Sequence, residues 1–172
     1  MYCGGGGASK FAAVAALLVC GLAYGQQAGQ PNEDQTGFFA LIVLQNTLSE
    51  QIEQQRLSDP LQAAGLERRA QTQLGLATSD YALLTAICRR ARREFSALSG
   101  ESNAYMASVR RGGGFPERAV LAELARRRQG LLISTIAGLR DVVTPQAWKA
   151  LNRYVAEEIR PRLRSKELQY GK

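Results

Sequence analysis

The sequence predicts an all-α fold: a helical bundle, or an open set of long antiparallel helical hairpins, with four to five helices. Three observations predict it. From about residue 36 onward, apolar residues recur at every third or fourth position. Capping residues and prolines precede several of these periodic stretches. No stretch shows the alternation or the two-residue hairpin turns that are typical of strands. A chain of 172 residues has room for one domain of this kind.

Residues 1–25 have the features of a secretory signal peptide. Lys10 precedes an apolar run over residues 11–22, and Ala23-Tyr24-Gly25 places small residues at the two positions that a signal peptidase reads. As a helix the run would cover about 18 Å, too short for a bilayer core of about 30 Å. We therefore expect cleavage after Gly25, export to the periplasm or the extracellular space, and no stable membrane span afterwards. The alternatives are a buried N-terminal helix and a lipid anchor on Cys20.

The remainder is predicted to be a disordered leader at 26–35 followed by a single helical domain at 36–172. The leader has no large apolar residue to bury. The first helix should run from near Thr36 to near Leu57. Asp59 and Pro60 then offer an N-cap and a first-turn proline for a second helix, which should run toward Gln73. Gly75 suits the left-handed position that ends such a helix.

The clearest pattern predicts one long helix at about 79–111. Thr78 is its expected cap, and Asp80 places an acid in the first turn. Apolar or small side chains then follow heptad spacing. They are Tyr81, Leu84, Cys88, Ala91, Phe95, Leu98, Ser102, Tyr105 and Val109. The main alternative is a kink or break near residues 99–103, because Gly100 weakens a helix by about 1 kcal/mol relative to alanine.

Two more helices complete the expected fold. Gly112–Gly114 is a loop, and Pro116 should begin the next helix. Thr144 and Pro145 form the sharpest boundary, an N-cap followed by a first-turn proline. Pro161 should then bend or end the last helix.

Charge is unevenly distributed along the chain. Residues 26–88 carry three basic and seven acidic side chains, whereas residues 89–128 carry ten basic and four acidic ones. Arginine is suited to planar contact with carboxylate or phosphate. The candidate binding residues are therefore the clustered arginines Arg89, Arg90, Arg92, Arg93, Arg126, Arg127 and Arg128. A solvated helix face would also explain them.

Several kinds of chemistry lack their usual residues. The chain has no His, so the commonest general base and metal ligand is absent. Signal removal would leave Cys88 as the single thiol, and its heptad position favours a small buried residue over a reactive one. Gly112–Gly114 lacks the Gly-Lys-Ser/Thr of a phosphate-binding loop. We predict no enzyme activity and no catalytic residue, cofactor or metal site.

Two stretches carry a resemblance to known exported proteins. Residues 74–84 (LGLATSDYALL) and 143–151 (VTPQAWKAL) each place a cap before a helix, on either side of a long basic hairpin. Over most of residues 36–165 the chain looks like a group of exported helical proteins from environmental bacteria, a likeness that brings no activity with it. More distantly, the two Thr-capped helix starts resemble the Spy/CpxP-type periplasmic stress proteins, whose signature is Leu-Thr-x-x-Gln. That resemblance implies a curved helical dimer whose basic concave face shields unfolded clients.

Three functions compete on this basis. The leading one is a non-catalytic exported protein, chaperone-like, that binds peptides, unfolded proteins or an envelope partner. The second is electrostatic binding of anionic lipid or another polyanion by the clustered arginines. The third is a hydrolase. A homodimer formed through the heptad seam is possible under the first, and we expect no nucleic-acid partner because no recognised binding motif is present.

Overall fold

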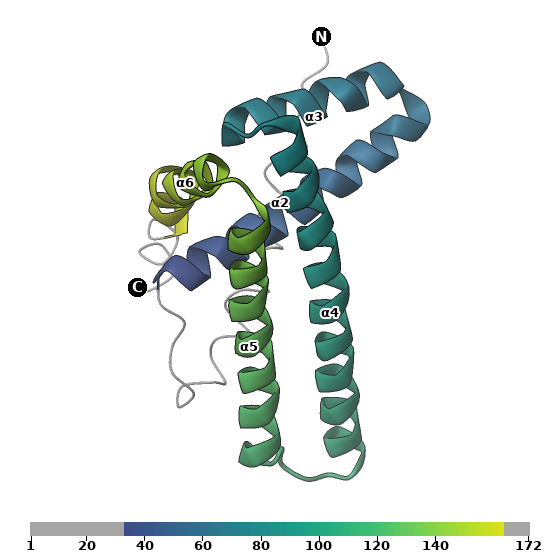
Figure 1. The fold of residues 1–172 in the computed structure, drawn as a ribbon. Helices are drawn as coiled ribbons and strands as arrows, with labels where there is room; N and C mark the ends of the chain where they lie inside the picture. The colour runs from purple at the N-terminus through teal and green to yellow at the C-terminus, as the bar shows by residue number, and fades with distance from the viewer. Residues whose placement is uncertain (1–32, 164–172) are drawn as a thin grey trace.

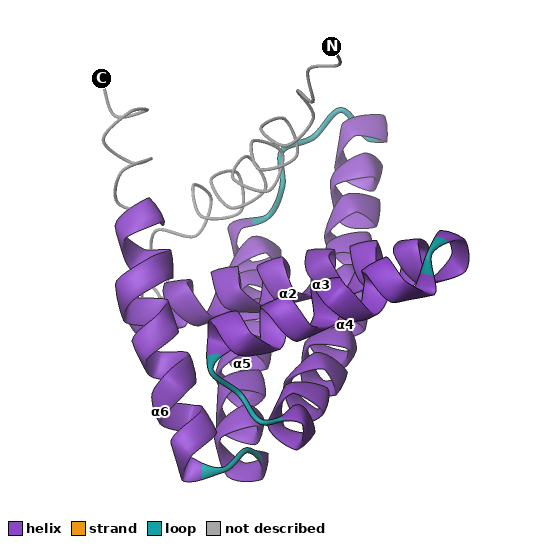
Figure 2. Ribbon diagram, turned by 90° about the horizontal axis from the view of Figure 1, so that it is seen from above, coloured by secondary structure: helices purple, strands orange, loops and turns teal. Residues whose placement is uncertain are grey.

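The computed structural model describes residues 33–163, and all regular structure in this range is helical. In chain order the elements are α2 (Glu33–Ser58), α3 (Pro60–Leu74), α4 (Thr78–Arg111), α5 (Arg118–Val142), α6 (Pro145–Tyr154) and the π-helical turn η1 (Val155–Ile159). The predicted all-α class is confirmed, with no strand among the described residues (Figure 2). The predicted signal peptide, and the predicted leader up to residue 32, lie outside this range. No helix within it is both long and apolar enough to cross a membrane.

The helices form two antiparallel hairpins and a C-terminal helix (Figure 1). α2 and α3 make the first hairpin. α4 and α5 make a longer one, whose far end projects away from the other helices. The N-terminal half of α2 packs against η1, and α2 also contacts both α4 and α5. We call residues 92–131 of the second hairpin the arm, and the rest of the described chain the head.

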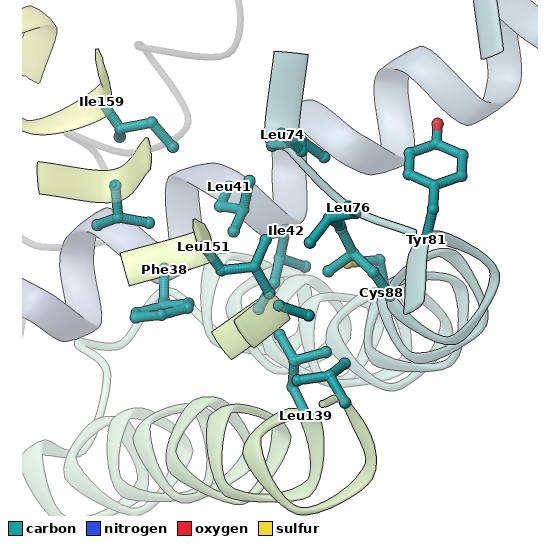
Figure 3. Close-up of a cluster of buried hydrophobic side chains, with 14 of the residues drawn as sticks. Phe38, Leu41, Ile42, Leu74, Leu76, Tyr81, Cys88, Leu139, Leu151 and Ile159 are labelled. Atoms are coloured by element: carbon teal, nitrogen blue, oxygen red, sulfur yellow. The ribbon is translucent and has the colours of Figure 1, made fainter. Parts of the chain in front are cut away.

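The head contains one hydrophobic core to which α2 to α6 and η1 all contribute (Figure 3). The ring of Phe38 stacks on that of Trp148, with 5.1 Å between the centroids. Long side chains from α3, α4, α5, α6 and η1 complete the core, including Leu74, Leu84, Leu139, Leu151 and Ile159. Because Ala40, Leu41 and Ile42 are consecutive and all buried, α2 is covered on more than one side and is the central helix of the head.

Most helix ends follow the predicted capping signals. The Asp59 carboxylate accepts hydrogen bonds from the backbone N–H groups of Leu61 and Gln62, at 3.1 and 3.0 Å. Gly75 adopts the left-handed conformation, with a φ of 66°, and closes α3. The Thr144 hydroxyl caps α6 by accepting from the N–H of the third residue that follows, at 3.2 Å. These ends are therefore set by local chemistry.

Three helix starts differ from the prediction. α2 begins at Glu33, within the segment predicted as leader, rather than near Thr36. Thr78 is the first residue of α4, so the N-cap is Ala77 and not Thr78 as predicted. The Thr78 hydroxyl accepts a hydrogen bond from the Gln71 side chain at 3.1 Å. α5 begins at Arg118, two residues after Pro116, and its N-cap is Glu117.

The long helix is continuous from Thr78 to Arg111, so the alternative of a break near Gly100 is wrong. Gly100 has no neighbouring atom within 4 Å of where a Cβ would lie. α5 runs alongside α4 over this stretch (Figure 1), and this packing holds the helix through the glycine.

Pro161 does not end the last helix, which continues through residue 163. The turn before it widens instead: the Arg160 N–H donates to the carbonyl of Val155, five residues earlier. In a regular α-helix the proline ring would meet the carbonyl of Glu157 and leave it without a donor. A π-helical turn relieves that conflict, so the distortion lies one turn before the proline.

Candidate binding surfaces

Beyond its base, where Arg92 and Phe95 contact α2, the arm is a pair of helices that the head does not cover (Figure 1). The buried side chains of α4 lie between Asp80 and Ala91, and those of α5 begin at Leu132. Between these limits every side chain on both helices is partly buried or exposed. From Ala91 to Arg111, α4 advances about 30 Å. The arm therefore presents a long surface outside the core.

The predicted heptad seam continues along the arm, but its burial changes. Its first four positions, Tyr81 to Ala91, are buried in the head. The remaining five are only partly buried, and they are Phe95, Leu98, Ser102, Tyr105 and Val109. On α5, Leu121 and Leu124 are partly buried in the same way. Two helices cover a shared seam from two sides only, so the apolar strip remains accessible along its edges.

The junction of the arm and the head is marked by an aromatic contact. Phe39 of α2 meets Phe95 of α4 edge to face, with 5.3 Å between ring centroids and an interplanar angle of 76°. Nearby, the Gln45 amide donates to the Thr85 hydroxyl at 3.1 Å. An aromatic pair in this geometry adds about 0.5–1.5 kcal/mol beyond area burial, so the contact between Phe39 and Phe95 helps to hold the base of the arm against α2.

The first predicted arginine group lies where α4 passes α2. Arg89 donates to Glu53 at 2.7 Å, and Arg92 pairs with Glu50; both acids belong to α2. Arg90 pairs with the glutamate one turn later in α4, at 2.8 Å, and this hydrogen bond raises the pKa of its guanidinium. Three of the four arginines are therefore neutralised by carboxylates.

An open hollow of about 360 Å³ lies over these ion pairs. Its lining consists of Asn46, Ser49, Glu50, Glu53, Gln54, Arg89, Arg92 and Arg93. The Oδ1 atom of Asn46 is buried and has no hydrogen-bond partner within the described range. Arg93 is the one arginine of the group that no carboxylate pairs with in residues 33–163. The hollow offers polar contacts, but its charges are largely balanced from within.

The second predicted group lies on the arm and links its two helices. Arg127 of α5 makes two hydrogen bonds to Glu101 of α4, at 2.6 and 3.2 Å, which lower the pKa of that carboxyl. Arg128 donates to the Ser99 hydroxyl at 3.3 Å. Arg126 pairs with Glu123 on its own helix. The contacts of Arg127 and Arg128 therefore cross from α5 to α4, and two of the three arginines pair with carboxylates.

The structure does not combine the seven predicted arginines into one cationic surface. The first group faces α2 and the second lies on the arm, and five of the seven pair with carboxylates. The sequence contained a signal for the first group, since the acidic segment before residue 88 and the basic segment after it carry opposite charge. The sequence pattern alone does not show that the two segments pair, and it predicts a loop at residues 112–114 without a binding role.

Cys88 is buried at the base of the seam, as predicted for a small core residue. Burial raises the pKa of its thiol to about 12, so it stays protonated at neutral pH and is a poor nucleophile. Among residues 33–163, no three or more Cys, Asp or Glu side chains gather in a group that could hold a metal ion.

The two capped helix starts that carry the resemblance lie against each other in the head. Asp80, which is 4% exposed, accepts from both the backbone N–H and the hydroxyl of Thr144, each at 2.9 Å. The Thr144 hydroxyl in turn accepts from the Ala147 N–H. This network joins the start of α4 to the start of α6, so both motifs have a structural role.

No family model, curated protein or solved structure matches the chain. The resemblance to exported helical proteins and to the Spy/CpxP type therefore stays a prediction.

Proposed function

We propose that this protein is an exported, non-catalytic binding protein whose arm holds an apolar segment of a peptide or of an unfolded chain. One observation carries the proposal. Along the arm, Leu98, Tyr105 and Val109 are partly buried and lie outside the core of the head, whereas Phe95 at the base of the arm packs against that core. An apolar strip of this kind gains free energy when a further apolar segment covers its open edges.

The shape of the strip favours an extended segment over a compact ligand. From Phe95 to Val109 it covers about 21 Å, a length that roughly six residues of extended chain would match. Its flanks carry ion pairs such as Arg127–Glu101, which are exposed and stay in water. A polar rim around an apolar centre is the usual arrangement of a binding surface that releases its partner again.

The polar groups of the head support a binding role over catalysis. Its single thiol is buried and protonated. The carboxylates of α2 are held in exposed pairs with arginines, such as Arg89–Glu53, rather than converging on an enclosed site. General acid–base catalysis requires a group poised to release and take up a proton near neutral pH, and the protonated thiol of Cys88 does not meet that requirement.

Suppression of aggregation tests the proposal. A reduced model client would be followed by light scattering with the purified protein added. We expect suppression at equimolar amounts, and we expect Leu98→Ser with Val109→Ser to require several-fold more protein for the same effect. Leu57→Ser is the matched control, because Leu57 is exposed at the end of the other hairpin. No suppression at equimolar amounts contradicts the proposal, and so does an equal loss in the control.

A second copy of the chain is the other occupant that could close the strip. Sedimentation velocity separates the two cases. A monomer that suppresses aggregation leaves the strip available for clients, whereas a stable dimer that the Leu98→Ser and Val109→Ser changes dissociate would assign the strip to self-association.

A further inference from the structure

The end of the arm combines an exposed aromatic side chain with positive charge. We call residues 110–118 the tip; it comprises the last residues of α4, the loop, and the first residue of α5 (Figure 1). Phe115 is 95% exposed, more than any other large apolar side chain of the described range. Arg110 and Arg111 precede the loop and Arg118 follows it.

The loop that carries Phe115 is held by hydrogen bonds. Gly113 adopts the left-handed conformation with a φ of 66°, a position that favours glycine. The N–H groups of Gly112 and Gly114 donate to carbonyls in the last turns of α4, at 3.0 and 3.3 Å. The Tyr105 hydroxyl accepts from the Glu117 N–H at 2.7 Å and so fixes the far side of the loop. Phe115 is therefore held outward by an ordered loop, which lowers the entropy cost of using it as an anchor.

Five of the seven clustered arginines nearer the head pair with a carboxylate, whereas none of the three tip arginines does so among the described residues. No carboxylate pairs with Arg110, Arg111 or Arg118 within residues 33–163. The reason is visible in the sequence, since no Asp or Glu lies three or four positions from any of them. Glu117 is the single acid of the tip. The tip thus holds three arginines that form no ion pair with an acid of the described residues.

We propose that the tip docks on the surface of an anionic lipid bilayer, with Phe115 in the interfacial region and the three arginines on lipid phosphates. Guanidinium groups bind phosphate in a planar fork, and basic side chains near an anionic leaflet each add favourable energy. Aromatic side chains are favoured at the membrane interface. A protruding tip with one aromatic ring fits a bilayer, which needs no preformed pocket, whereas a protein partner would need a cavity shaped to receive it.

Vesicle flotation tests this proposal with the full purified protein. We expect binding to vesicles of phosphatidylcholine containing 30% phosphatidylglycerol, and little binding to phosphatidylcholine alone. Each arginine should contribute about fivefold to partitioning, so Arg110→Gln with Arg111→Gln should weaken binding about 25-fold. Phe115→Ser should weaken it about tenfold. Binding should also fall steeply as salt is raised.

Two control variants remove the same kinds of side chain from parts of the protein outside the tip. Arg69→Gln with Arg140→Gln removes two exposed charges from the head, and Leu57→Ser removes an exposed apolar side chain from the other hairpin. Both should bind vesicles as the unmodified protein does. The proposal is overturned if the controls lose as much binding as the tip variants, or if phosphatidylcholine alone binds equally well. It is also overturned if Phe115→Ser has no effect while polyglutamate competes, because that result would indicate an acidic polymer rather than a membrane.

Discussion

A methyl group added at Gly37 tests how closely α2 approaches the π-helical turn. A Cβ at this position would lie 2.5 Å from Cγ1 of Val155, a side chain that is 1% exposed. Carbon atoms in ordinary contact lie about 3.5–4.0 Å apart. Alanine therefore requires α2 to move away from η1, or Val155 to leave its preferred rotamer. Either change disturbs a close-packed core.

The magnitude follows from two opposing effects. Overpacking a core by one methyl group costs about 1–3 kcal/mol, while alanine is favoured over glycine inside a helix by about 1 kcal/mol. We expect Gly37→Ala to lower the free energy of unfolding by about 1 kcal/mol. Gly100→Ala is the matched control, since nothing lies within 4 Å of its added Cβ. It should raise the free energy of unfolding by about 1 kcal/mol.

Urea denaturation followed by far-ultraviolet circular dichroism measures both variants. A third variant places Gly37→Ala in a Val155→Ala background, where the clash is absent and the same alanine should now stabilise the protein as Gly100→Ala does. If Gly37→Ala stabilises the otherwise unmodified protein as much as Gly100→Ala, the close contact between α2 and η1 is refuted.

Burial of Cys88 should make the protein less stable in alkaline solution. Because its pKa is raised from 9.0 to about 12, the folded chain keeps a proton that the unfolded chain releases. The free energy of unfolding should therefore fall by roughly 1.4 kcal/mol per pH unit between pH 9 and 12, and Cys88→Ala should remove that part of the slope in urea titrations. Asp80→Ala should cost about 1–2 kcal/mol, measured by the same denaturation, since both donors of Thr144 lose their acceptor. Arg127→Gln should leave the urea midpoint unchanged, because its pair with Glu101 is exposed.

Each of these expectations has a contrary result. An alkaline slope that is the same in Cys88→Ala as in the unmodified protein would show that other groups cause it. If Asp80→Ala leaves the free energy of unfolding unchanged, water must replace the carboxylate between α4 and α6. A large fall in the urea midpoint of Arg127→Gln would mean that the pair with Glu101 contributes more to stability than exposed ion pairs usually do.

The helices could be predicted because their signals are local. Asp59 with Pro60, and Thr144 with Pro145, place a cap and a proline next to each other, and the structure uses both pairs as expected. The role of Asp80 at the start of α4 could not be predicted in the same way. Asp80 turns toward Thr144, 64 positions away in the chain, so its role depends on how α4 and α6 meet. The π-helical turn depends on a clash in three dimensions that the identity of Pro161 alone does not locate.

The same distinction separates the arginine contacts that sequence could predict from those it could not. Arg90 and Arg126 pair with acids three or four positions away, a spacing that is visible in the sequence. Arg89 and Arg92 pair with acids of α2, and those contacts exist only because α2 crosses α4. A count of charges by region therefore overestimates the positive surface near the head. It underestimates the tip, which has fewer arginines but none that pairs with an acid among the described residues.

The distribution of ion pairs along the arm implies that the apolar strip and the tip have different functions. Near the head, α2 supplies acids to the arginines of α4. Along the middle of the arm, Glu101 of α4 pairs with Arg127 of α5, and Glu123 pairs with Arg126 within α5. At the tip both helices end, so the arginines there meet solvent. If the strip binds clients and the tip binds membrane, Phe115→Ser should lose vesicle binding and keep suppression of aggregation. Leu98→Ser with Val109→Ser should do the reverse. Loss of both activities in either variant would show that strip and tip form one surface, because each change removes contacts from a different part of the arm.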